Sequence, residues 1–309
     1  MNSFVSAAKF ISNTIRSSNK NGSAVTRGIT SSLARSTKNI SAMKSRLPTS
    51  VIIRANFSTS GSDIMSHFVA KGSDLEGNSI EEAMHSLANA DAVCFDVDST
   101  VINEEGIDVL ADSLGKGEEV AAWTVKAMEG DTKFEDALAA RLDIIKPSRA
   151  SILKCLDDHP LVLSPGVDRL VEVLMQNGTH VFLVSGGFRI MIEPVAKSLG
   201  ISKSNIVANT IFFDEDSATG EYSGFCRDEP TSADMGKPKA VQMLKDEHGY
   251  ENVVMVGDGA TDAQAKPPAN AFVGFGGVAV REAVRGKACW YVRDFEDMIE
   301  VVEKFGKRM

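Results

Sequence analysis

The 309-residue sequence has only four cysteines, and they do not occur in pairs. Cys94, Cys155, Cys226 and Cys289 form no CxxC motif and have no histidines at the spacing of a zinc site. Their scatter therefore predicts reduced, mostly buried thiols rather than disulfides. The sequence also lacks a run of about 18 apolar residues, so we expect no transmembrane helix and no membrane partner.

Acidic residues are absent from the beginning of the chain. Residues 1–62 contain nine Lys and Arg, no Asp or Glu, and many Ser and Thr. No apolar stretch of about 7 to 15 residues suggests a secretory signal, and Phe4, Ala7, Ile11 and Ile15 can share one helical face. We predict that residues 1–60 are a cleavable transit peptide for a mitochondrion or a plastid. The alternative is a basic tail without a targeting role.

The rest of the chain has the opposite charge. Residues 63–309 hold 24 basic and 42 acidic residues, which gives a net charge of −18. A body this acidic argues against nucleic acid and anionic membranes as partners. The hydrophobic share of 43% is sufficient for one large core or two lobes.

Short apolar segments alternate with helix-like segments after residue 160. This alternation predicts an α/β fold, a Rossmann-like parallel sheet with helices on both faces. A polar turn between two further apolar segments predicts a β-hairpin of 206–213 with 221–225. The predicted strands of the sheet are 92–95, 179–184, 252–256, 271–275 and 289–292, and the predicted helices are 167–177, 189–199, 237–248 and 281–284.

Residues 104–159, between the first predicted strand and this alternation, are predicted to be almost wholly helical. We predict that this segment is a helical cap, inserted after the first strand, that covers the site and determines substrate specificity. The catalytic core then consists of residues 61–103 and 160–309.

Polar residues follow three of the predicted strands. Asp96 and Asp98 come after the first strand, Ser185–Gly187 after the second, and Asp258 after a later one, while Lys237 begins a helix. Ligands bind beyond the carboxyl ends of parallel strands, so we expect these groups to share one site. Each motif alone is also compatible with an ordinary strand end, turn or loop.

Together these groups favour phosphoryl transfer. Mg²⁺ prefers oxygen ligands, and Asp96 and Asp258 can supply two carboxylates. Asp96 can also attack phosphorus, while Asp98 can protonate the leaving group and then deprotonate water. Ser185 and the backbone N–H groups after it can hold phosphate oxygens, to which Lys237 adds a positive charge.

The order of these motifs resembles that of the haloacid dehalogenase superfamily. From about residue 90 to 302 the chain is similar to the phosphoserine phosphatases within it. The matching stretches include Asp96-Val-Asp-Ser-Thr-Val, Ser185-Gly-Gly-Phe-Arg, Lys237, Gly257-Asp-Gly-Ala-Thr-Asp262 and, in the predicted cap, Ala127-Met-Glu-Gly and Arg141-Leu.

This resemblance implies an Mg²⁺-dependent phosphatase for O-phosphoserine, acting through an aspartyl phosphate in the last step of phosphorylated serine biosynthesis. It implies that Asp96 is the nucleophile and a metal ligand, and that Asp98 is the general acid/base and binds metal through its backbone carbonyl. Asp258 would be the remaining metal ligand, with Asp262 an acidic partner beside it. Ser185, Gly186 and Lys237 would bind the phosphate.

In the predicted cap, the resemblance implies that Glu105 meets the substrate ammonium and Arg141 its carboxylate, a pairing that guanidinium can make bidentately. Met128 and Phe134 would shape the pocket. Taken without the resemblance, Glu105 and Arg141 are ordinary surface charges, and Met128 and Phe134 are ordinary core residues.

Two stretches differ from the family pattern. Glu129 stands where many members have glycine, and Ser232–Gly236 replaces a glycine-rich turn before Lys237. Three alternatives stay open: a related capped phosphatase for phosphothreonine or phosphohomoserine, a catalytically silent protein that binds a phosphometabolite, and phosphoryl transfer to free serine. The sequence does not indicate an oligomeric state.

Overall fold

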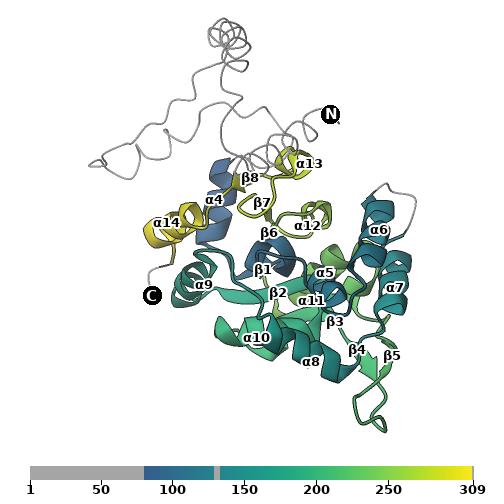
Figure 1. The fold of residues 1–309 in the computed structure, drawn as a ribbon. Coiled ribbons are helices and arrows are strands. Elements are labelled where there is room, and N and C mark those ends of the chain that lie inside the picture. The colour runs from purple at the N-terminus through teal and green to yellow at the C-terminus, as the bar shows by residue number, and fades with distance from the viewer. Residues whose placement is uncertain (1–79, 129–132, 308–309) are drawn as a thin grey trace, which may run out of the picture. The chain divides into compact units, whose positions relative to one another are not determined.

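The computed structural model describes residues 80–128 and 133–307 (Figure 1). The predicted transit peptide, residues 1–60, lies outside the described residues, as does Glu129. The backbone of Met128 ends a helix, but its side chain is not among those described.

A six-stranded parallel sheet forms the centre of the fold, in the order β3-β2-β1-β6-β7-β8. This confirms the predicted α/β class. The central strand β1 is buried along its whole length, as expected for a parallel sheet that is covered on both faces. The strands are β1 (Ala92–Phe95), β2 (His180–Phe188), β3 (Ile206–Asn209), β6 (Val253–Gly257), β7 (Ala271–Phe275) and β8 (Trp290–Val292).

Two hydrophobic clusters cover the two faces of the sheet. Successive side chains of a strand point to opposite faces, so Val93 and Phe95 join one cluster and Ala92 and Cys94 the other. The first cluster includes α4 (Ile80–Ala88), α9 (Val167–Gln176), α10 (Arg189–Ser198) and α14 (Glu296–Phe305). The second cluster includes α11 (Gly236–His248), the end of α12 (Ala260–Gln264) and α13 (Glu282–Arg285).

The described part of residues 104–159, the predicted helical insert, forms four helices, as the sequence predicts. They share a third hydrophobic cluster, to which Phe188 and Met191 contribute from the β2–α10 junction. The division of the chain into core and cap stays a prediction. The four helices are α5 (Gly106–Ser113), α6 (Gly117–Met128), α7 (Phe134–Ile145) and α8 (Arg149–Asp158).

The predicted hairpin is wrong in its first strand. Residues 206–213 do not form one strand but two, β3 in the main sheet and β4 (Ile211–Phe213), which pairs antiparallel with β5 (Tyr222–Phe225). Glu229 explains the break at Thr210. Its carboxylate accepts the Thr210 N–H at 2.5 Å and the Thr210 hydroxyl at 2.8 Å, so Thr210 is held outside the parallel ladder.

Two further elements differ from the prediction. Strand β2 continues through Ser185–Gly187 to Phe188, with a register shift against β3, where the sequence suggests that it ends at Val184. Helix α14 follows the last predicted strand and packs against α4 and α9 (Figure 1). Its first turn is preceded by Phe295, which is fully buried and stacks on Phe275 with ring centroids 4.2 Å apart.

All four cysteines are free thiols, as predicted, and burial raises the pKa of Cys94 to about 12. Within the described part of the chain, no helix combines the length and apolar character needed to cross a membrane.

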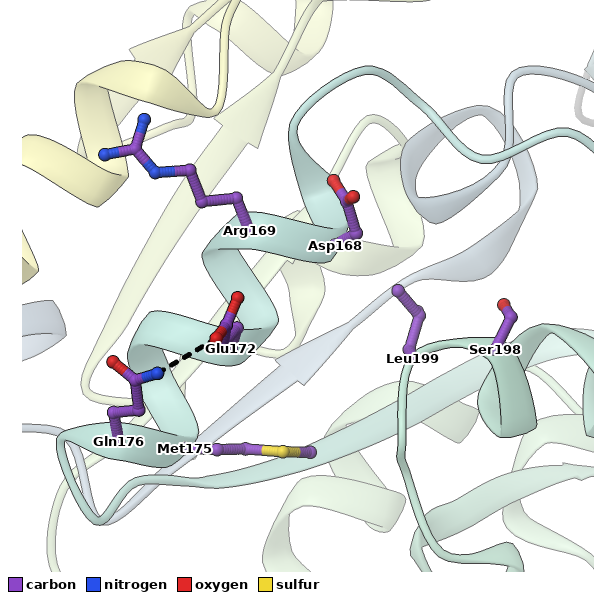
Figure 2. A pocket seen from close by; sticks show the side chains of 7 residues that line it. All are labelled: Asp168, Arg169, Glu172, Met175, Gln176, Ser198 and Leu199. Atoms are coloured by element: carbon purple, nitrogen blue, oxygen red, sulfur yellow. Dashed lines mark hydrogen bonds between the residues drawn. The ribbon is translucent and has the colours of Figure 1, made fainter.

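A surface cavity of about 720 Å³ lies between α9 and the end of α10, lined by residues such as Asp168, Glu172 and Met175 (Figure 2). Three of its polar side chains already pair with one another or with α14. Gln176 donates to Glu172 at 3.0 Å, and Arg169 forms ion pairs with Glu296 and Glu303. None of the predicted site residues lines this cavity, and we assign it no function.

The stack of Phe295 on Phe275 predicts a large loss of stability on truncation. Phe295→Ala should lower the free energy of unfolding by about 3–5 kcal/mol, because it leaves a cavity against the sheet. Phe212→Ala, at a residue 47% exposed, is the matched control and should change stability by no more than about 0.5 kcal/mol. Urea denaturation of the three proteins measures both values. Equal losses for the two variants would contradict the packing described here.

Candidate active site

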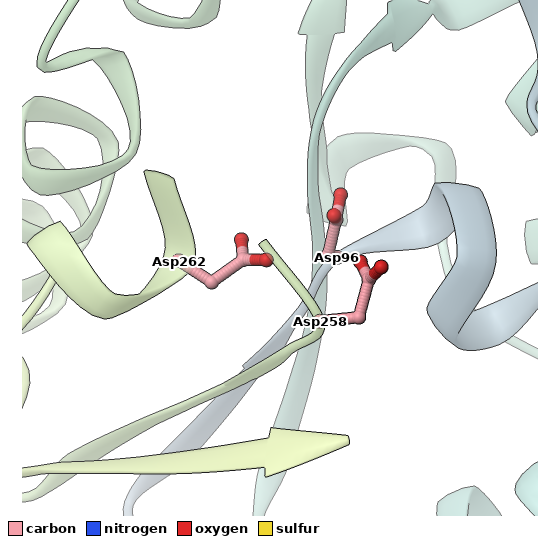
Figure 3. A group of neighbouring side chains, drawn as sticks. All are labelled: Asp96, Asp258 and Asp262. Atoms are coloured by element: carbon pink, nitrogen blue, oxygen red, sulfur yellow. The ribbon is translucent and has the colours of Figure 1, made fainter. Parts of the chain in front are cut away.

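Asp96 lies directly beyond the carboxyl end of β1. Its backbone N–H still donates to Val256 of the neighbouring strand, at 2.9 Å, so the sheet fixes where the side chain begins. The Oδ1 atom of Asp96 accepts the N–H of Val97 at 2.8 Å. The side chain is mostly buried and points into the space between β1, β6 and α12 (Figure 3).

Three carboxylates meet in this space. Asp96, Asp258 after β6 and Asp262 of α12 each offer an oxygen, and these oxygens lie within 4.8 Å of one another (Figure 3). Burial raises the pKa of Asp258 to about 8, and the nearby Asp96 carboxylate contributes to this rise. An all-oxygen donor set of this kind fits a hard divalent cation such as Mg²⁺.

The ammonium of Lys237 neutralises part of this charge. Its Nζ atom lies 2.8 Å from Asp96 Oδ1 and 2.5 Å from Asp262 Oδ1, and all three side chains are buried. Burial alone would lower the pKa of Lys237, but the two carboxylates outweigh it and raise the pKa above its ordinary value. Asp262 also accepts the N–H of Gly259 at 2.8 Å, so it holds Lys237 toward Asp96.

The carboxylate of Asp98 has different neighbours. Its Oδ1 accepts the N–H of Gly106 at 2.7 Å, and its Oδ2 accepts the hydroxyl of Ser185 at 3.3 Å. Loss of hydration, with the charges of Glu105 and Asp96, raises the pKa of Asp98 to about 7. A carboxyl group with this pKa can both give and take a proton near neutral pH.

Glycines allow the end of β2 to approach the two other segments closely. A Cβ atom on Gly187 would lie 3.0 Å from Asp98 Oδ2, and one on Gly186 would lie 3.0 Å from the ring of Phe134. The N–H of Gly187 donates to Ser185 Oγ at 2.8 Å, which orients that hydroxyl. The structure thus brings Ser185 and Gly186 to the same site as Asp96 and Asp98.

Asn209, which the sequence reasoning missed, supports this glycine segment. It is fully buried at the end of β3. Its amide donates to the carbonyl of Gly186 at 2.8 Å, and its carbonyl accepts the hydroxyl of Thr231 at 2.9 Å. Asn209 therefore ties the end of β2 to the segment that leads into Lys237. A polar residue at the end of a short apolar strand is its only sequence signal.

Arg281 is a second residue that the sequence reasoning missed. Its Nη2 atom lies 2.9 Å from Asp258 Oδ2 and 3.5 Å from Glu105 Oε1. One guanidinium thus contacts a core carboxylate and a carboxylate at the start of α5. The sequence shows Arg281 only as the first residue of a predicted helix.

Two predicted pocket residues come from the helices between β1 and β2. Arg141 of α7 donates through Nε to the carbonyl of Ala137, at 3.2 Å. Loss of hydration lowers the pKa of Arg141, while the carboxylates of Asp108, Glu105 and Asp98 oppose this shift. Phe134, at the start of α7, lies against Gly186 as described above. The structure therefore brings Arg141 into the same electrostatic environment as Glu105 and Asp98.

The unusual segment before Lys237 leaves that lysine in place. Met235 adopts a positive φ of 55° before α11, and Gly236 passes so close to Pro230 that a Cβ atom would lie 2.3 Å from its carbonyl oxygen. The N–H of Asp234 donates to Glu135 of α7 at 3.2 Å. This segment therefore also connects the core to the helices above the site.

Comparisons with known proteins agree with this geometry. Residues 90–266 match the family model of the haloacid dehalogenase-like hydrolases. The chain is 47% identical over 232 residues to the chloroplastic phosphoserine phosphatase of Arabidopsis thaliana, a match that covers 74% of this chain and 78% of the relative. It is 45% identical to the phosphoserine phosphatase of Bos taurus over 72% of this chain and 98% of the relative.

Among solved structures, a phospho-aspartyl intermediate analogue of a phosphoserine phosphatase matches with a TM-score of 0.58 and 25% identity. The match covers 69% of this chain and 99% of that protein.

The raised carboxyl pKa values predict how metal-free protein responds to pH. Asp98 and Asp258 hold protons up to about pH 7 and about pH 8 when folded, whereas unfolded carboxyls release them near pH 4. The folded state binds more protons in this window, so stability should fall as pH rises from about 5 to about 8. Thermal unfolding in EDTA measures this slope.

Mg²⁺ requires deprotonated ligands, so it should raise Tm more at about pH 8 than at about pH 6. Asp258→Asn is the control variant, and in EDTA its Tm should depend less on pH. A Tm in EDTA that rises over this range would contradict the protonation described here.

Proposed function

The chain belongs to the haloacid dehalogenase-like hydrolases and, within them, to the phosphoserine phosphatases, and we propose that it hydrolyses O-phosphoserine with Asp96 as the nucleophile. One observation carries the choice of nucleophile. Asp96 and Asp262 both contact the Lys237 ammonium and lie beside Asp258, but both oxygens of Asp262 are bound, whereas the described contacts of Asp96 use only its Oδ1.

The contacts of Asp96 also indicate which of its oxygens attacks. Val97 N–H and Lys237 Nζ both bind Oδ1. Oδ2 is therefore the oxygen that bonds to phosphorus, while the serine oxygen leaves. Asp98 gives its proton to that oxygen, which its pKa of about 7 permits near neutral pH. The products of this first half are free serine and an aspartyl phosphate on Asp96.

The second half reverses the role of Asp98. Its carboxylate now takes a proton from water, and the water oxygen attacks phosphorus and displaces Asp96. Inorganic phosphate leaves, and both aspartates return to their starting states. In both halves of the reaction, the phosphoryl oxygens are bound by Ser185, Gly186 and Lys237. The solved phosphoserine phosphatase described above holds a phospho-aspartyl intermediate analogue, which supports this route.

We propose Mg²⁺ as the cofactor, held by the carboxylates of Asp96 and Asp258 and by the backbone carbonyl of Asp98. Asp262 has an oxygen within reach of the same position, but both of its oxygens already bind Lys237 or Gly259. We therefore keep Asp262 as the acidic partner of Lys237. When bound, Mg²⁺ neutralises charge on the phosphate and aligns it with Asp96.

Recognition of the amino acid is proposed for Glu105 and Arg141. Free phosphoserine carries an ammonium and a carboxylate on one carbon, so a carboxylate and a guanidinium facing it can read both. Ser99 and Arg281 contact the same oxygen of Glu105, Oε1, so we propose that Oε2 binds the substrate ammonium. Arg141 bonds to Ala137 through Nε, so we propose that its Nη1 and Nη2 atoms bind the substrate carboxylate. We propose that Phe134 shapes the pocket, and the resemblance to the family implies the same role for Met128.

The remaining proposals concern the whole chain. We propose a core of residues 61–103 and 160–309, with residues 104–159 as the cap that determines specificity. Residues 1–60 are proposed as a transit peptide, and the chloroplastic relative from Arabidopsis supports a plastid as the destination. The enzyme would then complete phosphorylated serine biosynthesis in that organelle, with a small molecule as its partner.

The full chain should release phosphate from O-phosphoserine in Mg²⁺ and lose this activity in EDTA. On phosphothreonine, phosphohomoserine and glycerol phosphate, kcat/KM should be at least about tenfold lower. The first two carry an extra methyl or methylene group that the pocket must accommodate, and glycerol phosphate lacks both the ammonium and the carboxylate. Phosphate release measured on this panel tests the function. Asp158→Asn, which removes an exposed carboxylate paired with Lys154, is the activity control.

Preference for another ester would keep the Asp96 chemistry and overturn Glu105 and Arg141 as readers of serine. No turnover of any ester would indicate a silent binding protein.

A further inference from the structure

Ser99 has a backbone conformation that residues other than glycine rarely adopt. It follows Asp98 in the turn after β1, with φ 54° and ψ 12°. Three described non-glycine residues have positive φ, namely Ser99, Lys146 and Met235. Lys146 ends a helix and Met235 precedes one, and both are exposed, whereas Ser99 is only 5% exposed. Ser99 is therefore the one of the three whose side chain is enclosed by the protein.

The backbone N–H and the hydroxyl of Ser99 both bind the segment that leads into α5. Its N–H donates to the carbonyl of Glu104 at 3.1 Å, and its hydroxyl donates to Glu105 Oε1 at 2.8 Å. The other described partner of that oxygen is Arg281, at the longer distance of 3.5 Å. The Glu105 side chain makes no capping bond to α5. The Ser99 hydroxyl is thus the closest contact of the Glu105 carboxylate.

Glycine would adopt this backbone conformation without strain, since it has no Cβ atom. A side chain present at such a position points to a role for that side chain. The conformation is also what directs the hydroxyl away from Asp98, whose own carboxylate binds Gly106 and Ser185, and toward Glu105.

We propose that Ser99 is a positioning residue that determines recognition of the substrate ammonium. Its hydroxyl engages one oxygen of Glu105 and so holds the second oxygen where the ammonium of phosphoserine binds. Without the hydroxyl, Arg281 is the remaining described partner of Glu105, and its charge draws the carboxylate toward Asp258. This inference rests on the proposed role of Glu105 in the function above.

Two substrates distinguish a role of Ser99 in recognising the ammonium from a general structural role in the turn. O-phosphoserine and 3-(phosphonooxy)propanoate share the phosphate ester and the carboxylate, but only the first has the ammonium. For Ser99→Ala and Ser99→Gly we expect kcat/KM on O-phosphoserine to fall about tenfold, mainly through KM, because one positioned contact is lost. Activity on the deamino ester should stay unchanged, and so should the pH profile of kcat.

Ser113→Ala is the matched control. It removes a hydroxyl whose hydrogen bond, to the carbonyl of Leu110, is also 2.8 Å long, in the helix that follows Glu105. We expect no change on either substrate. Equal losses on both substrates in the Ser99 variants would mean that Ser99 only supports the turn, and would overturn the proposal. Full activity of both Ser99 variants on both substrates would overturn it as well.

Glu105→Gln distinguishes failure of this inference from failure of the proposed function. If Glu105→Gln alone lowers the preference for O-phosphoserine over the deamino ester, the role of Glu105 stands. Adding Ser99→Ala to Glu105→Gln should then cause no further loss, since Ser99 acts through Glu105. A full additional tenfold loss would contradict the proposal. A Glu105→Gln variant with unchanged preference would instead overturn the proposed role of Glu105.

Discussion

The buried ammonium of Lys237, between Asp96 and Asp262, is the interaction on which the site depends. Three carboxylates close together repel one another, and burial removes the water that would screen them. Lys237 contacts two of them and Arg281 contacts the third, Asp258. Two cations against three buried carboxylates leave a site that still favours a divalent cation. The same ammonium contacts Oδ1 of Asp96, and we propose that Oδ2 is the oxygen that attacks.

The sheet places these charges, and we propose that the helices above it determine the selectivity. Strands β2, β1 and β6 are neighbours, so the segments after them meet without any long excursion of the backbone. Glycines at the end of β2 allow Asp98 and Phe134 to approach closely. Glu105 precedes α5 and Arg141 lies in α7. In the proposed function, the phosphate chemistry and the recognition of the amino acid therefore come from different parts of the chain.

Local sequence patterns were sufficient to predict five of the six strands of the main sheet and the polar residues that follow β1, β2 and β6. The run Ala92–Phe95 predicted the central strand, and it placed the two proposed catalytic carboxylates directly beyond the end of that strand. Arg281 and Asn209 could not be found in this way, because their roles arise from contacts with Asp258 and Gly186, which are distant in sequence. The break at Thr210 was missed for the same reason, since Glu229 causes it.

Trapping the aspartyl phosphate tests the central claim most directly. The full chain is mixed with O-[³²P]phosphoserine and Mg²⁺, quenched in acid and reduced with borohydride, which converts a phosphorylated aspartate to homoserine. Before reduction, the acid-quenched protein should carry ³²P and the Asp96→Asn variant should carry none. After reduction, which releases the labelled phosphate, peptide mass spectrometry should find homoserine at position 96 alone. Homoserine at position 98, or phosphate release without any labelled intermediate, would contradict Asp96 as the nucleophile.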